Sequence, residues 1–324
     1  MTTLSQLGEF SLIERIKARA NKLRAPDIVT GIGDDAAVLR PRAGEDLVVS
    51  TDALVEDVHF RFRNQSPATI GRRALLVNLS DLAAMGARPV GFTLAMCAPA
   101  KLSVAKVDAL IEGLLREAAT NQCPLIGGNL SGAQKTTLSV TILGAVPRGK
   151  GLLRSAARPG DRIFVTGTVG GAGIALQTAE KNDSALRHLP TPRVATGRAL
   201  LRSKYRGACI DLSDGIAADL RHVVEASNVG AEVDPSRLPT PRGFANRCGA
   251  LGLDPTEVAL RAGEDYELLF TMRRAWLEGT KSNVTALSKQ LGAPVTEIGH
   301  IVKAAGIRGL PDSIQSKGFR HFRA

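Results

Sequence analysis

The sequence predicts an α/β protein of two domains, and three observations support this fold class. Segments with the apolar pattern of strands alternate with segments patterned as helices, and this alternation occurs twice along the chain. The 324 residues exceed one typical domain and suffice for two, each with its own core. A stretch rich in Arg, Gly and Pro, residues 148–161, separates the two series. We therefore expect one domain over 1–147 and a second over 148–324.

The first domain begins with a charged amphipathic segment and an acidic loop. Residues 1–23 predict one helix with four apolar side chains on one side: Leu12, Ile13, Ile16 and Leu23. The run "GIGDDAAVL" (31–39) then combines two glycines with the adjacent carboxylates Asp34 and Asp35. It resembles a dinucleotide-binding glycine loop, but two carboxylates would repel a phosphate unless a cation stood between them. The loop therefore indicates a metal ion.

Strands and helices alternate through the rest of this domain. Within residues 46–55 the pattern predicts a strand that ends at Asp52. Residues 66–87 predict a helix with Ser66 as N-cap, Pro67 at its first position and Gly86 near its end. The other expected elements are strands at 90–97, 124–129 and 137–146 and a strongly periodic helix at 103–120.

The second domain repeats the pattern. Residues 162–177 predict a strand, a glycine-rich turn and a helix; the turn lacks the Lys and Ser/Thr of a P-loop, and both phosphate contact and close helix packing remain open for it. Residues 208–224 predict a strand and a helix capped by Ser213, with Asp214 in its first turn. A last apolar strand follows three carboxylates: Glu264, Asp265 and Glu267.

Composition narrows the class of function. The formal net charge of +11 admits a nucleic acid, a membrane surface or an anionic small molecule as partner, but no nucleic-acid-binding motif occurs and aromatic residues for base stacking are scarce. No apolar run approaches the roughly 20 residues needed to cross a bilayer. The four cysteines are far apart without a C-x-x-C pair, which predicts neither zinc nor disulfides and favours the cytoplasm. We expect neither a nucleic acid nor a membrane as partner.

Carboxylates at the ends of apolar strands are the main chemical signal. No histidine or thiol cluster accompanies them, and hard oxygen ligands of this kind favour Mg²⁺, which is usually bound together with substrate phosphates. This set comprises Asp34, Asp35, Asp52, Asp81, Asp211, Asp214, Glu264 and Asp265. Each also suits a structural role, as a solvated turn, a helix start or a solvent-facing side chain. The pattern alone predicts a two-domain, Mg²⁺-using enzyme that acts on phosphates.

Seven motifs together resemble one family. "GIGDDAAV", "STDALVEDVHF", "NLSDLAAMGA", "LIGG", "VTGTVGGAGIAL", "IDLSDGIAADL" and "GEDYELLF" occur in the order found in the thiamine-monophosphate kinases, members of the superfamily built like aminoimidazole ribonucleotide synthetase. The resemblance implies the two-domain fold of that superfamily, with an N-terminal mixed sheet that pairs across a homodimer. It also implies ATP-dependent phosphorylation of thiamine monophosphate to thiamine diphosphate.

The resemblance also implies roles for individual residues. The positions that match Mg²⁺ ligands are Asp35, Ser50, Thr51, Asp52, Asp81, Asn129, Asp211 and Asp214. Those that match ATP contacts are Gly128, Asn129, Arg154 and Ser213. Those that match thiamine monophosphate contacts are His59, Glu264 and Phe319, and an aromatic face with a carboxylate suits a cationic thiazolium ring. Because phosphoryl transfer needs alignment and charge neutralisation, we assign no nucleophile and expect direct in-line transfer.

One position departs from the family pattern. The family has "GGD" where this chain has "GGN", so Asn129 replaces a metal-binding aspartate and keeps only a neutral carbonyl oxygen for Mg²⁺.

Two alternative functions remain. Among enzymes, a purine-pathway synthetase shares the fold and ATP chemistry but is not expected to carry the "STDALVEDVHF" and "GEDYELLF" pair. A basic nucleic-acid-binding protein is the alternative from another class.

Overall fold

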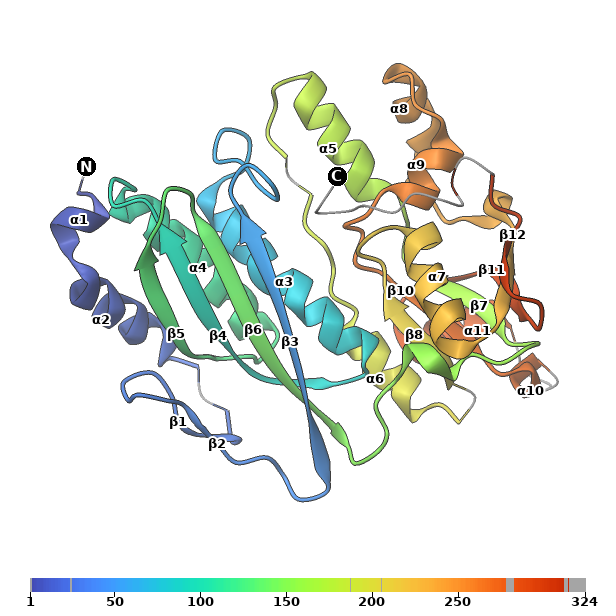
Figure 1. The fold of residues 1–324 in the computed structure, drawn as a ribbon, viewed down its shortest axis with the longest axis horizontal. Coiled ribbons are helices and arrows are strands. Elements are labelled where there is room, and N and C mark those ends of the chain that lie inside the picture. The colour runs from blue at the N-terminus through green and yellow to red at the C-terminus, as the bar shows by residue number, and fades with distance from the viewer. Residues whose placement is uncertain are drawn as a thin grey trace. The chain divides into compact units, whose positions relative to one another are not determined.

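The computed structural model describes residues 2–23, 25–186, 188–204, 206–277, 283–311 and 314, and the chain divides into two compact units. Unit 1 contains residues 1–82, 87–149 and 185–189, and unit 2 contains 83–86, 150–184 and 190–324. Each is an α/β arrangement of its own (Figure 1). In the part of the chain that is described, no helix combines the length and apolar character needed to cross a membrane.

Unit 1 is built on a four-stranded mixed sheet of order β3-β6-β4-β5. The β4–β5 pair is parallel and the other two pairs are antiparallel. The elements of this unit are α1 (Leu4–Leu7), α2 (Glu9–Ala20), β1 (Ile28–Thr30), β2 (Val38–Leu39), β3 (Glu45–Val55), α3 (Pro67–Ala84), β4 (Arg88–Ala98), α4 (Val104–Thr120), β5 (Leu125–Gly132) and β6 (Thr137–Pro147).

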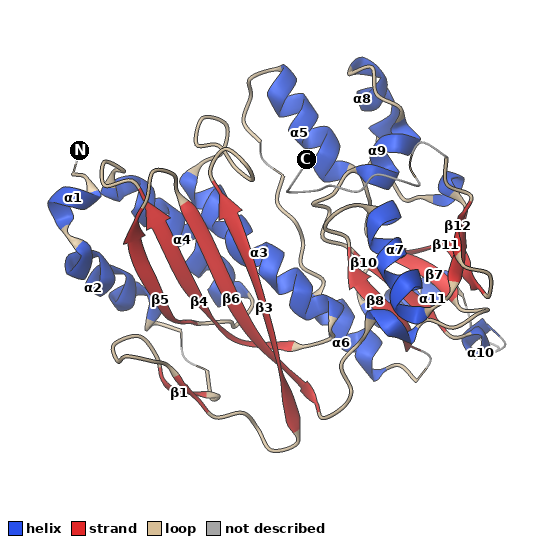
Figure 2. Ribbon diagram, viewed as in Figure 1, coloured by secondary structure: helices blue, strands red, loops and turns tan. Residues whose placement is uncertain are grey.

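Helices α3 and α4 lie behind this sheet in Figure 2 and cover one of its faces. The two helices approach closely at two glycines: a Cβ on Gly71 would lie 1.8 Å from the Leu110 carbonyl oxygen, and one on Gly113 would lie 2.0 Å from that of Ala68. The predicted start of α3 is confirmed, because Pro67 is its first residue and the Ser66 hydroxyl accepts a hydrogen bond from the Thr69 amide at 3.1 Å. The strands and the helix predicted over 90–146 are also present.

Two predictions about unit 1 are corrected. The N-terminal segment forms two helices instead of one, because Gly8 adopts a φ of 82° between α1 and α2; of the four apolar side chains assigned to one side, only Leu12 is buried. Strand β3 continues to Val55, so Asp52 lies within the strand and not at its end. The extension follows from the pairing of β3 with β6, which continues as far as Val55 and Thr137.

Unit 2 is built on a six-stranded sheet of order β12-β9-β11-β7-β10-β8. Only the β12–β9 pair is parallel, so this sheet is mainly antiparallel. The elements of this unit are the 3₁₀ turns η1 (Arg154–Ala156) and η2 (Pro235–Arg237), β7 (Arg162–Thr166), α5 (Gly171–Lys181), α6 (Val194–Arg202), β8 (Arg206–Asp211), α7 (Ile216–Ser227), β9 (Gly230–Val233), α8 (Phe244–Ala250), α9 (Pro255–Arg261), β10 (Leu268–Met272), α10 (Arg274–Leu277), α11 (Val284–Leu291), β11 (Val295–Val302) and β12 (Gly306–Arg308).

The sheet of unit 2 carries a core on each face. Ile163 and Val165 of β7 pack in a cluster that includes side chains of α7, α8 and α9, whereas Phe164 of the same strand packs in a second cluster with α6 and α11. The Phe164 and Phe270 rings stack with centroids 5.5 Å apart. Burial on both faces explains why these strands are nearly continuous apolar runs in the sequence.

Candidate functional site

Three of the predicted metal-binding residues of unit 1 lie around the contact between β3 and α3. The Ser50 hydroxyl donates to a carboxylate oxygen of Asp81 on α3 at 2.6 Å. The Asp52 backbone amide donates to the side chain of Asn78, one turn earlier on that helix, at 3.1 Å. Asn78 is buried, and its own amide group donates to the Ala74 carbonyl. The structure therefore brings Ser50, Asp52 and Asp81 together.

The sheet register separates other members of the predicted set from this group. Asp52 pairs with Val140, which pairs with Leu94, and both of these side chains are buried against the helices. Asn129 instead pairs with the exposed Ala95. Because paired residues share a face and successive residues alternate, Asn129 lies on the opposite face of the sheet from Asp52.

Thr51 shares the open face with Asn129. Its hydroxyl lies 3.1 Å from that of Thr141 on β6 and also donates to the Val140 carbonyl at 3.0 Å. Gly128, on β5 before Asn129, approaches β4 so closely that a Cβ would lie 2.1 Å from the Leu94 carbonyl oxygen. A glycine is therefore required at 128 by packing alone.

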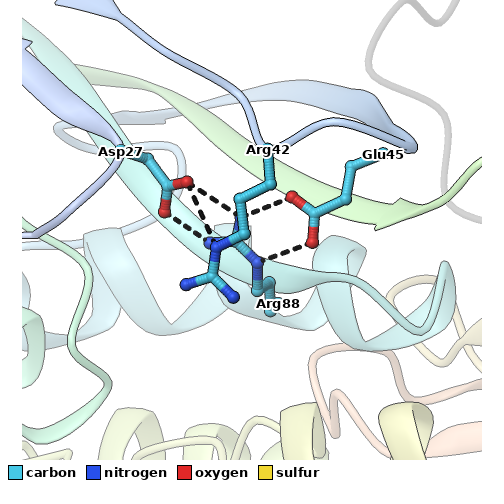
Figure 3. A network of polar contacts seen from close by, with 4 residues as sticks. All are labelled: Asp27, Arg42, Glu45 and Arg88. Carbon is cyan, nitrogen blue, oxygen red and sulfur yellow. Dashed lines mark hydrogen bonds and ion pairs between the residues drawn. The ribbon is translucent and has the colours of Figure 1, made fainter.

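The acidic loop between β1 and β2 holds Asp34 and Asp35 in solvent. Both carboxylates are exposed, and the Asp35 amide donates to Asp34 at 2.9 Å, which is a local turn contact. Just before β1, Asp27 is buried and paired with Arg88 at the start of β4, with nitrogen–oxygen distances of 2.7 and 3.1 Å (Figure 3). Arg88 also contacts Glu45 of β3 at 2.6 and 3.1 Å. This ion-pair network ties the segment that carries the acidic loop to two strands of the sheet.

His59 lies in the turn that follows β3. Its Nδ1 atom accepts a hydrogen bond from the Val55 amide at 3.1 Å, so the neutral ring carries its proton on Nε2. Its carbonyl accepts from the Arg73 guanidinium of α3 at 2.5 Å. These contacts fix the turn in which His59 stands.

The carboxylates of unit 2 gather after β8. Asp211 is the last residue of β8 and is buried, and the Asp214 amide donates to Asp219 at 3.1 Å. Burial, with the charge of Asp211 next in importance, raises the pKa of Asp219 to about 8. The Arg154 guanidinium acts in the opposite direction on this pKa, and its exposed side chain therefore stands within electrostatic range of the cluster. The segment after β8 therefore brings several carboxyl groups close to the end of one strand.

The start of α7 differs from the sequence prediction. The helix begins at Ile216 with Gly215 at the N-cap and no side-chain cap, and Asp219, not Asp214, lies in its first turn. Ser213 and Asp214 stand in the loop before it, half-buried. A Cβ on Gly215, at a φ of 97°, would lie 2.8 Å from the Arg261 backbone, so close packing against the end of α9 sets this start. Asp219 was not among the predicted site residues. The available signal was its spacing after "SDG" on an apolar helix face.

Glu264 lies in the segment that precedes β10, together with the two other carboxylates that the sequence places before this strand. Asp265 and Glu267 are both buried. The Glu267 carboxylate receives two hydrogen bonds from Arg193, each 2.6 Å long, and one from the Thr166 hydroxyl at 2.5 Å. The expected substrate contact at Phe319 lies outside the described residues.

No three His, Cys, Asp or Glu side chains form a metal-binding group by themselves within the described ranges of the chain. The four cysteines are free, and burial raises the pKa of the Cys123 and Cys209 thiols, so neither is a thiolate at neutral pH. The oxygen donors of the candidate residues are carboxylates, hydroxyls and carbonyls, a set that suits a hard divalent cation completed by water and phosphate oxygens.

Comparison with known proteins places these residues in a family. The family model of the AIR synthase related protein, N-terminal domain, matches residues 33–146. The model of the corresponding C-terminal domain matches residues 158–310. Thiamine-monophosphate kinase of Bacillus subtilis is 36% identical over 98% of this chain and 100% of its own length. That of Salmonella typhimurium is 40% identical over 97% of this chain and 98% of its own.

Solved structures agree with the sequence relatives. Thiamine-monophosphate kinase from Stenotrophomonas maltophilia superposes with a TM-score of 0.80 at 39% identity, covering 93% of this chain and 96% of that one. A structure described as AaThiL complexed with AMPPCP and TMP gives 0.76 at 31% identity, covering 99% of both chains. Hydrogenase maturation protein HypE, at 20% identity and a TM-score of 0.72, shares the fold. The family resemblance and the two-domain fold that the motifs predict are confirmed: this chain belongs to the thiamine-monophosphate kinase family of AIR synthase related proteins.

Proposed function

We propose that this chain transfers the γ-phosphoryl group of ATP to the phosphate of thiamine monophosphate, giving thiamine diphosphate and ADP. The observation that carries the proposal is full-length similarity to relatives of that name, one of which has been solved with AMPPCP and TMP. The seven motifs lie within the described residues of the two units, and their polar side chains stand on the loop between β1 and β2, on β3 and α3, in the loop after β8 and in the segment before β10.

Mg²⁺ is the cation that the proposal requires. In unit 1 its ligands are drawn from Asp35, Ser50, Thr51, Asp52 and Asp81, with Asn129 as a further member through its carbonyl oxygen, and in unit 2 from Asp211 and Asp214. The buried Asp211 and Asp219 near Asp214 support this assignment, because carboxylates buried close together repel one another and a bound cation relieves that repulsion. When bound, Mg²⁺ neutralises charge on the phosphoryl oxygens.

The residues of the chain supply contacts and alignment. Ser213 and Arg154 are proposed to contact ATP together with Gly128 and Asn129, and His59, Glu264 and Phe319 to contact thiamine monophosphate. The Glu264 carboxylate can balance the positive thiazolium ring, and the Arg154 guanidinium can balance phosphate charge. No side chain is assigned as a nucleophile, so the phosphoryl group passes directly between the two substrates.

A homodimer formed by the open face of the unit 1 sheet is part of the proposal. On this face Val49 is 61% exposed and Leu47 is 45% exposed, on the strand at the edge of the sheet. Large apolar side chains exposed side by side on a sheet face are typical of an interface.

A cytoplasmic location of the protein is also part of the proposal.

Phosphorus NMR tests the proposed reaction. Purified protein incubated with ATP, Mg²⁺ and thiamine monophosphate should give the resonances of thiamine diphosphate and ADP. Free thiamine in place of the monophosphate should be a poor acceptor, because the reaction extends an existing phosphate. Absence of a diphosphate product, or equal reaction of free thiamine, would overturn the proposal.

A further inference from the structure

The segment that carries Glu264 has an unusual backbone. Glu264 has a φ of 67° and Tyr266 has a φ of 51°, so two residues with side chains adopt the left-handed conformation on either side of Asp265. Such residues cost about 1 kcal/mol or more each and persist only where the surroundings fix them. The surroundings of residues 263–267 therefore have to supply several strong contacts.

Backbone hydrogen bonds attach this segment to the loop after β8. The Glu264 amide donates to the Ser213 carbonyl at 2.8 Å, and the Tyr266 amide donates to that of Leu212 at 2.9 Å. In return the Leu212 amide donates to the Glu267 carbonyl at 2.8 Å. At Gly263 a Cβ would lie 2.2 Å from the Ser213 carbonyl oxygen, so the two segments are in direct contact. The segment with Glu264 thus lies directly against the loop with Ser213 and Asp214.

Asp265 attaches the same segment to the glycine-rich turn before α5. One carboxylate oxygen accepts from the Gly170 amide at 2.6 Å and the other from the Ala172 amide at 3.0 Å. Gly170, with a φ of 79°, is the N-cap of α5, so the carboxylate occupies the end of the helix where amides and dipole favour an anion. The two amides that a phosphate would need in this turn are therefore already bonded to Asp265.

The neighbouring carboxylate has a different role in the same segment. Glu267 is neutralised by the bidentate contact with Arg193 and bonded to Thr166, so it anchors the start of β10. Asp265 is 7% exposed, and its side chain bonds instead to the start of α5. The backbone between these two anchors contains Tyr266, and the backbone before Asp265 contains Glu264.

We propose that Asp265 is a positioning residue for the acceptor substrate: by binding the amides of Gly170 and Ala172 it holds Glu264 in its left-handed conformation and fixes the Glu264 carboxylate relative to the Ser213–Asp214 loop. This inference rests on the proposed function, in which Glu264 contacts thiamine monophosphate. The Ser213–Asp214 loop has a further anchor in the bond from the Asp214 amide to Asp219, so it keeps its place when Asp265 is changed. Loss of Asp265 therefore affects the acceptor more than ATP.

Kinetics of Asp265→Asn and Asp265→Ala test the proposal. The asparagine keeps the size and one acceptor oxygen but turns an amide group toward a backbone amide, whereas the alanine removes both bonds. At pH 8 the carboxylate of the unchanged protein is ionised, because burial raises its pKa only to about 7. We expect the KM for thiamine monophosphate to rise about tenfold or more in both variants, because small displacements of a binding group have effects of this size. The KM for ATP should change less than about threefold.

Asp254→Ala is the matched control. Asp254 also accepts a backbone amide at a helix start, from Glu257 at 2.7 Å, but it caps α9 and has no bond to residues 263–267. It should lower thermal stability without changing either KM. Hydrogen exchange adds a reading that does not depend on activity: the Glu264 and Tyr266 amides should exchange faster in Asp265→Asn, and the Asp214 amide should not.

The outcomes separate the two proposals. If the unchanged protein lacks activity on thiamine monophosphate, the proposed function fails. If it is active and the Asp265 variants alter stability as Asp254→Ala does, with unchanged KM for thiamine monophosphate and unchanged exchange at Glu264, the positioning role is wrong. Should Asp265→Ala not fold, Asp265→Asn decides by the same two measurements.

Discussion

Asp52 and Asn129 lie on opposite faces of the unit 1 sheet, so their side chains have different neighbours. Asp52 shares the covered face of the sheet with Ser50, which bonds to Asp81 of α3. Asn129 shares the open face with Ala95. The cation that we propose at the β3–α3 contact would be reached from one face, so we expect the side chains on that face to dominate its affinity.

This separation gives a prediction for Mg²⁺ affinity. Asp52→Asn should raise the Mg²⁺ concentration for half-maximal rate about tenfold, because one unit of negative charge near the ion is lost. Asn129→Ala should shift the same midpoint less than about threefold. Titration of the initial rate with Mg²⁺ at saturating ATP measures both. An equal shift in the two variants would show that Asn129 binds the ion as strongly as Asp52.

At the scale of elements, the N-terminal strand pair is attached to the rest of unit 1 through an ion-pair network of Asp27, Glu45 and Arg88 (Figure 3). The Arg88 guanidinium is 15% exposed, and its hydrogen bonds are the largest cause that lowers the pKa of Asp27 and of Glu45. Removal of Arg88 would leave the buried Asp27 with Arg42, which is 57% exposed and 3.6 Å away, as its ion-pair partner.

Arg88→Ala should therefore destabilise unit 1 by about 3 kcal/mol at pH 7. The folded pKa values of Asp27 and Glu45 lie below the ordinary 3.8 and 4.5, so this stabilisation is present above those values and is lost as pH falls through the folded pKa values. Urea unfolding from pH 7 to pH 3 should show the variant and the unchanged protein converging in acid. Glu14→Ala, which removes an exposed pair with Lys17, is the control and should change stability by less than about 0.5 kcal/mol. A constant difference across this pH range would exclude the network as its cause.

The elements also show what sequence patterns can predict. The start of α3 at Pro67 and the strands from β4 to β6 follow from local signals, namely capping residues and apolar runs. The end of β3 depends on its pairing with β6, and the start of α7 on contact between Gly215 and α9, neither of which a local pattern contains. The bonds of Asp265 to the turn at Gly170 join residues 95 positions apart, so only the fold could show that this turn is occupied.

At the scale of the whole molecule, the proposed dimer makes the open face of the unit 1 sheet an interface. Val49→Asp would place a charge within the exposed apolar pair on the edge strand β3 and should convert the dimer to a monomer at micromolar concentration, because a buried unpaired charge costs several kcal/mol. Sedimentation velocity should give about twice the chain mass of 34.1 kDa for the unchanged protein and the chain mass for the variant. Lys135→Ala, away from the apolar pair Leu47 and Val49, should remain dimeric. A monomeric unchanged protein would contradict this assembly.

We propose, for the molecule as a whole, that one phosphoryl group moves from ATP to thiamine monophosphate on this chain. The most direct measurement uses ATP labelled at the γ-phosphorus, with Mg²⁺ and thiamine monophosphate, and follows the label and the ADP formed. We expect the label to enter the terminal phosphate of thiamine diphosphate, with one ADP formed for each labelled product. Label that stays in ATP, or that is released as inorganic phosphate while thiamine monophosphate is unchanged, would contradict it.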